Sequence, residues 1–252
     1  LNRFVFMGKY STAEIIQLIK SEKTFSGVHQ SGAFLIKIDR YVPYVCAAIH
    51  HGHQFRESLV PLTLLSEKER WEEEDPETGT FISLFPIALI VLDSRYEYDL
   101  NRPPKEAIYQ TAWDKPVWRE AISLIERQRS MRKYKAFYAV LQVLVKALEK
   151  KFNGLLVFDM HSYNPGRFLE QGKKAPTFNI GTTQIDRTKY QAVVERWISE
   201  LSLIELNSGP TDVRENEVFI GDGHFLQSIN SWTENTLVLA TEIRKDYVDL
   251  KS

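Results

Sequence analysis

The chain has 252 residues, of which 43% are hydrophobic and 26% charged, and its formal net charge at pH 7 is −1. This balance is typical of a globular protein and excludes the broad positive field that nucleic acids or acidic membrane surfaces attract. The only cysteine, Cys46, excludes an internal disulfide framework and any site with several cysteine ligands, so a metal would need histidine and carboxylate ligands.

Helical and extended patterns alternate in the first hundred residues. Apolar residues at helical spacing predict a helix at 11–23, and two apolar runs predict strands at 32–40 and 43–50. The second run is almost continuously apolar, as in a strand that is covered on both faces. A capping box predicts a helix at 66–75, and a further apolar run predicts a strand at 86–92.

The same alternation continues along the rest of the chain. The strongest helical periodicity covers 130–152, and a short apolar strand at 155–161 follows it. Another amphipathic helix is predicted at 186–201, and a late strand at 236–246. Apolar strands separated by long helices predict one α/β domain over residues 1–252, with a mixed, largely parallel sheet flanked by helices.

Three of the predicted strands carry polar side chains at or near their ends. His50 follows the run VCAAI, His161 ends LLVFDMH, and Glu242 lies within LVLATEI. Ligands of such sheets bind at the carboxyl ends of the strands, so these groups are candidates for one site. The crowding of His51 and His53 beside His50 also fits a polar loop with ordinary surface histidines, or an H-x-x-H metal pair.

The acidic run EEED at 72–75 supplies carboxylates between the two candidate histidines. A zinc site without cysteine commonly combines two imidazoles, one carboxylate and a water, while a separate carboxylate moves protons. The alternative interpretation of this run is a solvated helix end. Carboxylates near a helix C-terminus oppose the helix dipole, which favours a compensating cation close by.

The stretch DSRYEYDLNR at 93–102 alternates charged side chains after a buried strand. One interpretation is a solvated edge strand with paired charges. The other is that Asn101 and Arg102 clamp a substrate carboxylate, because a guanidinium matches the geometry of a carboxylate. No G-x-S-x-G elbow and no phosphate-binding glycine loop is present. Cys46, inside an apolar run, is expected to be a buried structural thiol.

Six motifs, read together, resemble the N-formylglutamate amidohydrolase family. They are AIHHGH, EEDPETG, SRYEYDLNR, FDMHSYN, FNIGT and ATEIRKDYVD, and they occur in the order of the family over about residues 45–250. The resemblance implies a hydrolase with a zinc-exopeptidase-like fold, similar to zinc carboxypeptidases and cell-wall amidases. Departures at Ile49, His51 and Pro76 indicate a divergent member.

The resemblance also implies roles for individual residues. One Zn²⁺ ion would be bound by His50, His161 and an acid, for which Asp75 is favoured and Glu74 is the rival. Glu242 would be the general base. The candidates for substrate binding are Arg95, Asn101, Arg102, Asn164, His53 and His224.

The implied activity is metal-dependent hydrolysis of the amide of a small N-acyl amino acid such as N-formylglutamate. The alternatives are a peptidase or amidase of the same fold that acts on another N-acyl amino acid or a peptide C-terminus, and a catalytically silent binding domain. The basic stretch at 127–135 is expected to begin a solvated helix rather than bind nucleic acid. No apolar run reaches the roughly 20 residues of a membrane span, and the N-terminal segment lacks the apolar core of a signal peptide. No membrane partner is therefore predicted, and a cytoplasmic location is expected.

Overall fold

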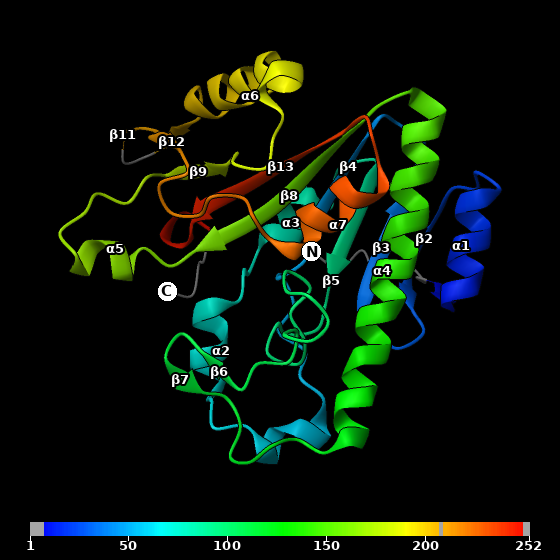
Figure 1. Cartoon of the computed structure of the whole chain (residues 1–252), viewed down its shortest axis with the longest axis vertical. Coiled ribbons are helices and arrows are strands. Elements are labelled where there is room, and N and C mark those ends of the chain that lie inside the picture. Colours follow the sequence, from blue (N-terminus) through cyan, green and yellow to red (C-terminus); the bar gives the residue numbers. More distant parts are fainter. Residues whose placement is uncertain (1–7, 207–208, 249–252) are drawn as a thin grey trace.

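The computed structural model describes residues 8–206 and 209–248, and a twisted nine-stranded sheet forms the centre of this part of the chain (Figure 1). The strands β4, β5, β8 and β13 pair in parallel where they adjoin, whereas β3 and β9 run antiparallel to their neighbours β5 and β13. The predicted mixed, largely parallel sheet is therefore confirmed. In spatial order the strands are β1 (Gly8–Tyr10), β2 (Phe25–His29), β3 (Phe34–Ile38), β5 (Ile87–Val91), β4 (Tyr44–Ala48), β8 (Leu155–Tyr163), β13 (Thr236–Arg244), β9 (Phe178–Gly181) and β12 (Val213–Glu215).

Helices cover both faces of the sheet, as the α/β pattern predicts. On one face α1 (Thr12–Lys20), α4 (Leu124–Phe152) and α7 (His224–Trp232) share a single core cluster with the sheet. Figure 1 shows the long helix α4 running beside α1. On the other face α3 (Thr78–Ile82) packs on β4 and β5, and α6 (Arg187–Ser202) packs on β13.

The continuous apolar runs arise because the central strands are buried on both sides. Alternate residues of β4 point into different clusters: Val45 and Ala47 face α4, whereas Cys46 and Ala48 face α3. All five residues of β5 are buried as well. A strand in this position has no solvent face, so its sequence loses the polar alternation of an edge strand.

The helix predicted at 130–152 begins six residues earlier in the structure, at Leu124, with Ser123 as its N-cap. The first two turns extend beyond the core, and Leu124 is 77% exposed. The apolar periodicity therefore begins later than the helix does. At the other end, Asn153 adopts a left-handed conformation before Gly154, so the predicted termination is observed.

The remaining predicted helices and strands are present with shifted ends, while several shorter elements were not predicted. No helix among the described residues combines the length and apolar character needed to cross a bilayer. The helix predicted at 66–75 is α2 (Glu67–Glu73), with the predicted capping box at Ser66 and Glu69. The shorter elements that were not predicted include η1 (Glu57–Leu62), α5 (Gly166–Glu170) and η2 (Lys245–Tyr247), with the small strands β6 (Thr111–Ala112), β7 (Lys115–Pro116), β10 (Glu205–Leu206) and β11 (Gly209–Pro210).

Candidate active site

Three adjacent strands bring the polar strand ends together. The strands β4, β8 and β13 are neighbours in the sheet. Glu242 of β13 lies opposite His161 of β8 in the parallel register, and His50 follows the end of β4 on the other side of β8. Side chains separated by more than 80 residues in sequence therefore line one end of the sheet, as expected for the carboxyl ends of parallel strands.

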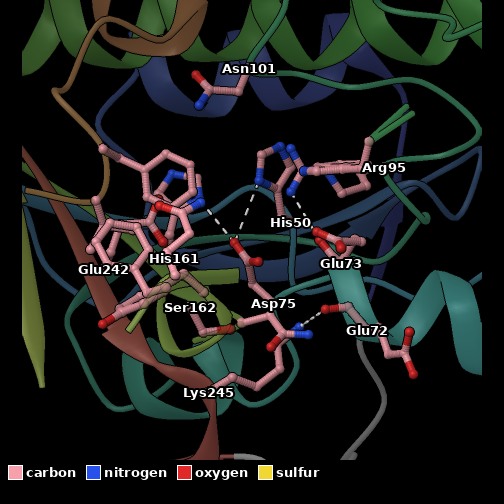
Figure 2. Close-up of a pocket in the computed structure, with 17 residues that line it drawn as sticks. His50, Glu72, Glu73, Asp75, Arg95, Asn101, His161, Ser162, Glu242 and Lys245 are labelled. Carbon is pink, nitrogen blue, oxygen red and sulfur yellow. Dashed lines mark hydrogen bonds and ion pairs between the residues drawn. The ribbon is translucent and has the colours of Figure 1, made fainter. Parts of the chain in front are cut away.

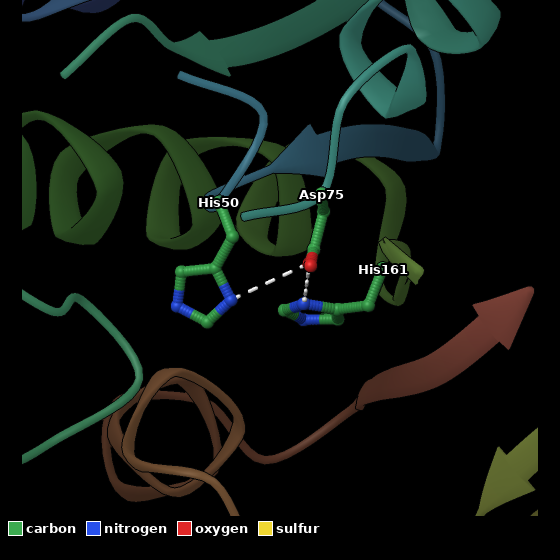
Figure 3. Close-up of side chains that lie close together, drawn as sticks. All are labelled: His50, Asp75 and His161. Carbon is green, nitrogen blue, oxygen red and sulfur yellow. Dashed lines mark hydrogen bonds and ion pairs between the residues drawn. The ribbon is translucent and has the colours of Figure 1, made fainter. Parts of the chain in front are cut away.

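His50, Asp75 and His161 form a buried group of imidazoles and carboxylate (Figure 3). The Nδ1 atom of His161 lies 2.9 Å from Asp75 Oδ2, and the Nδ1 atom of His50 lies 3.5 Å from the same oxygen. Asp75 is fixed through its backbone, because its N–H donates to the carbonyl of His50 over 2.8 Å. Ligand atoms from these three residues lie within 4.8 Å of one another, close enough to hold one metal ion.

A second carboxylate lies beside the Nε2 atom of each imidazole. Asp99 Oδ1 is hydrogen-bonded to His50 Nε2 over 2.8 Å, whereas Asp159 Oδ1 lies 3.0 Å from His161 Nε2 as an ion pair without hydrogen-bond geometry. Both Nδ1 atoms consequently face Asp75. His50 Nδ1 is buried without a hydrogen-bond partner, since 3.5 Å to Asp75 is too long for a hydrogen bond. A buried nitrogen without a hydrogen-bond partner, on an imidazole held by a carboxylate, fits a metal ligand.

The carboxylates and imidazoles of the site shift one another's pKa values. Burial by itself raises the pKa of Asp75, but the imidazoles of His161 and His50 outweigh it and lower the pKa of that carboxyl well below its usual value. Burial opposes protonation of His161, yet the Asp159 and Asp75 carboxylates raise the pKa of its imidazole well above the usual value. Burial raises the pKa of Glu242 to about 7, even though His161 pulls it down. The site thus combines ionised carboxylate with a carboxyl that titrates near neutrality.

Asp75 and Glu74 point to different partners, although they are adjacent in sequence. The Glu74 carboxylate lies 2.5 Å from His53 Nδ1 and also accepts a hydrogen bond from the Ser94 hydroxyl. His53 packs its ring edge-on to Trp71, with ring centroids 5.3 Å apart. The structure therefore brings Asp75, and not Glu74, beside the two imidazoles.

Lys245 is a buried cation that, together with Arg95, compensates the acidic end of α2. Its ammonium donates to the carbonyl of Glu72 over 2.6 Å and to the carbonyl of Glu74 over 2.5 Å, and it also reaches the carbonyl of Trp71. The terminal carbonyls of a helix have no partner within the helix, and a buried ammonium satisfies them and complements the dipole. The segment that leads into Asp75 is thereby tied to the end of β13.

Two cavities meet at the site, and we call them cavity A and cavity B. Cavity A has a volume of about 320 Å³ and cavity B of about 560 Å³. His161 and Glu242 line both (Figure 2 shows cavity A). His53 lines neither and lies in a third cavity with His51. Of the predicted substrate-binding residues, Asn164 lines cavity A, Arg102 and His224 line cavity B, and Arg95 and Asn101 line both.

The polar side chains of the 93–102 stretch differ in how many hydrogen bonds and ion pairs they form with the rest of the chain. Arg95 donates from Nη2 to Asp99 over 2.8 Å and from Nη1 to the carbonyl of Glu73 over 3.0 Å. The Asn101 side-chain oxygen accepts from the Phe225 N–H over 3.3 Å, which fixes the start of α7. The Arg102 side chain is exposed and, among the described residues, has no carboxylate partner.

Sequence patterns gave little reason to single out Asp99 and Lys245. Asp99 was one of several alternating charges in the 93–102 stretch, yet it contacts both His50 and Arg95. Lys245 belongs to the motif ATEIRKDYVD, but its partners lie more than 170 residues earlier in the chain. The sequence feature that could have pointed to Asp99 was its place in the DLNR motif. For Lys245 the only such feature was the expectation of a cation near the acidic end of α2.

The sheet, the flanking helices and the buried imidazole–carboxylate group define the chain as an α/β protein with an enzyme-like site at its strand ends. A family model described as N-formylglutamate amidohydrolase matches residues 42–248, so the chain belongs to that family. Family membership supports an amidohydrolase activity. A comparison with curated proteins found no match.

Two solved structures are similar to the chain over most of its length. One is the N-formylglutamate amidohydrolase from Ralstonia eutropha JMP134, at 18% identity and a TM-score of 0.64, with 85% of this chain and 86% of that chain covered. The other is a gene product from Agrobacterium tumefaciens, at 17% identity and a TM-score of 0.67, with 86% of each chain covered. At these identities the likeness establishes a shared fold.

Proposed function

We propose that the protein is a zinc-dependent amidohydrolase that cleaves the amide bond of an N-acyl amino acid, of which N-formylglutamate is the reference compound of the family. The observation that carries the proposal is the buried group of His50, Asp75 and His161 with Glu242 on the neighbouring strand. Two imidazoles and one carboxylate form a ligand set used by hydrolytic zinc enzymes. The chain has a single cysteine, so a ligand set with several cysteines is excluded.

The residues present fit a zinc ion. His50, His161 and Asp75 would hold it, and the orphan His50 Nδ1 atom supports this assignment. A bound zinc ion supplies Lewis acidity, which lowers the pKa of a water and polarises a carbonyl. The Asp99 carboxylate holds His50 by its other nitrogen through a hydrogen bond, and Asp159 forms an ion pair with Nε2 of His161.

In this proposal Glu242 is the proton-transfer group. Its carboxylate takes a proton from the attacking water and delivers it to the nitrogen of the leaving amine. Burial raises the pKa of Glu242, which favours release of the proton to the leaving amine. Its position opposite His161 and between the two cavities supports this role.

Arg102 is the residue that we propose for the substrate carboxylate. Its guanidinium lies at cavity B without a carboxylate partner among the described residues. The guanidinium carbon lies over the Tyr109 ring, 5.0 Å from the ring centroid. Arg95, the second candidate, is already bound to Asp99. We therefore propose that Arg95 acts mainly by holding Asp99, and through it His50, in place.

The test is metal analysis and kinetics on protein purified without a histidine tag. We expect about one zinc per chain and hydrolysis of at least one compound in a series of N-formyl, N-acetyl and dipeptide substrates. The Glu242→Gln variant should keep its zinc and lose about 100-fold or more in kcat, because general acid–base catalysis contributes that much. A chain that takes up no zinc at saturating concentrations, or a Glu242→Gln variant with the parent rate, would refute the mechanism.

A further inference from the structure

Trp113 has a backbone conformation that rarely accommodates a bulky side chain. It occupies the tip of the β6–β7 hairpin, where Ala112 pairs with Lys115 across a loop of two residues. Trp113 has φ = 48° and Asp114 has φ = 62°. Two-residue hairpin loops with positive φ at both positions favour Asn-Gly or Asp-Gly, and an aromatic residue there is disfavoured. Such an outlier is a reason to look for a function of its side chain.

The indole of Trp113 lies where cavities A and B meet. The Arg95 guanidinium carbon is 4.9 Å from the centroid of the indole. The rings of Tyr96 and Tyr109 each pack edge-on to the Trp113 ring, with centroids 5.8 Å apart. These contacts fix the ring beside the residues that hold His50. The hairpin therefore presents a rigid aromatic surface to whatever occupies the site.

Other apolar side chains line cavity A together with Trp113. Phe168 of α5, Val218 and Phe219 all belong to its wall, and Phe219 remains 49% exposed. Exposed aromatic surface inside a concave site is stabilised when an apolar ligand group covers it. A formyl group, which is a single carbonyl, would cover little of a cavity of about 320 Å³.

The charges of cavity A disfavour an anionic substituent. Glu72 and Glu73 line it at the end of α2. Outside the proposed zinc group, the cations that line it among the described residues are Arg95 and Lys245, and both already donate to groups of the chain itself, as the dashed lines in Figure 2 indicate. The side-chain carboxylate of a glutamate would meet like charge in this cavity without an available counter-charge.

We propose that Trp113, Phe168 and Phe219 form an apolar subsite in cavity A that accepts an aromatic or branched aliphatic group next to the scissile amide. The preferred substrate is then an N-acyl amino acid that carries such a group, rather than N-formylglutamate. This inference rests on the proposed amidohydrolase function. The apolar group belongs either to the acyl part or to the amino-acid side chain, and the substrates of the test separate these two sources.

The test compares kcat/KM for N-formylglutamate, N-formylphenylalanine and N-phenylacetylglutamate. We expect at least one aromatic compound to exceed N-formylglutamate by about tenfold or more, the discrimination that a hydrophobic pocket supplies. A faster N-formylphenylalanine assigns the subsite to the side chain, and a faster N-phenylacetylglutamate assigns it to the acyl group. If N-formylglutamate is the best of the three, the inference is wrong.

Trp113→Asn is the decisive variant, because asparagine suits a positive φ and preserves the turn while it removes the indole. We expect the preference for the aromatic compound to fall about tenfold, with an unchanged circular dichroism spectrum. Trp232→Phe is the matched control, since Trp232 lies at the end of α7 outside both cavities, and it should keep the preference. An equal preference in the parent and in Trp113→Asn would overturn the role of Trp113.

Calorimetric binding of the same three compounds to the zinc-loaded Glu242→Gln variant separates the subsite from the activity. Tighter binding of an aromatic compound, with no turnover of any compound by the parent, would support the subsite and refute the proposed reaction. Turnover of N-formylglutamate together with equal binding of all three compounds would support the reaction and refute the subsite.

Discussion

Single residues in the IHHGH segment have separate environments despite their proximity in sequence. His50 Nδ1 faces Asp75, and His50 Nε2 is held by Asp99. The His51 ring lies against Gly79, so closely that a Cβ on that glycine would come within 2.6 Å of it. His53 contacts Glu74. Only His50 belongs to the group around Asp75, which makes the three imidazoles natural controls for one another.

We predict that His50→Ala abolishes stoichiometric zinc binding, whereas His51→Ala retains about one zinc per chain. Loss of His50 removes one of three protein ligands, while His51 lies in a different cavity. Competition with a chromophoric chelator measures both affinities. Equal zinc affinities for the two variants would show that His50 is not a ligand.

At the scale of elements, the end of α2 and the end of β13 depend on each other through Lys245. The Lys245 side chain is 6% exposed, and its ammonium satisfies carbonyls of the segment that precedes Asp75. The start of α2 has an independent stabilising feature, a capping box between Ser66 and Glu69. The two ends of one short helix can thus be perturbed separately.

We predict that Lys245→Met weakens zinc binding and lowers the melting temperature, because it leaves buried carbonyls without a donor at a cost of about 1–3 kcal/mol. Ser66→Ala should cost about 1 kcal/mol through loss of the cap, yet leave the zinc affinity unchanged. Thermal melts and zinc titrations of both variants provide the measurement. If Ser66→Ala weakened zinc binding as much as Lys245→Met, general destabilisation of α2 would explain both results.

At the scale of the whole molecule, buried neutral histidines link stability to pH. His29 has both ring nitrogens in contact with hydroxyls, Thr12 Oγ1 at 3.0 Å and Ser31 Oγ at 2.7 Å, and its ring stacks on Phe34. Burial lowers the pKa of His29, although Asp93 partly opposes this. The unfolded chain therefore binds a proton here at a higher pH than the folded chain does.

We predict that the contribution of His29 to stability falls as pH decreases through about 6.5, the ordinary histidine pKa, and levels off below its lowered folded pKa. Melting temperatures measured between pH 7.5 and 5 with a chelator present test this, because the chelator removes any effect of metal release. The melting temperature of the parent relative to that of His29→Gln, which keeps a polar side chain, should fall as the pH is lowered over this range. Identical slopes for the two proteins would show that His29 does not contribute.

The sequence alone determined the fold class, the family and the identity of most candidate residues. Apolar runs and helical periodicity are local patterns, and they predicted β4, β5 and most of α4 because burial is regular along each element. The tertiary structure decided which side chains meet. Glu74 and Asp75 are neighbours in the chain, yet Glu74 contacts Ser94 and Asp75 contacts His161. The extended backbone at Glu74 directs the two side chains to these different partners.

The same limit applies to the residues that support the site. The contacts from His50 to Asp99 and from Asp75 to His161 span 49 and 86 residues of sequence, so no local pattern could reveal them. Trp113 gave no signal either, since its importance lies in a strained turn that the fold positions between two cavities. Local sequence patterns thus predicted the helices, the strands and the polar residues at the strand ends. Long-range packing determined which of these side chains contact one another, because the direction of a side chain depends on contacts that are distant along the chain.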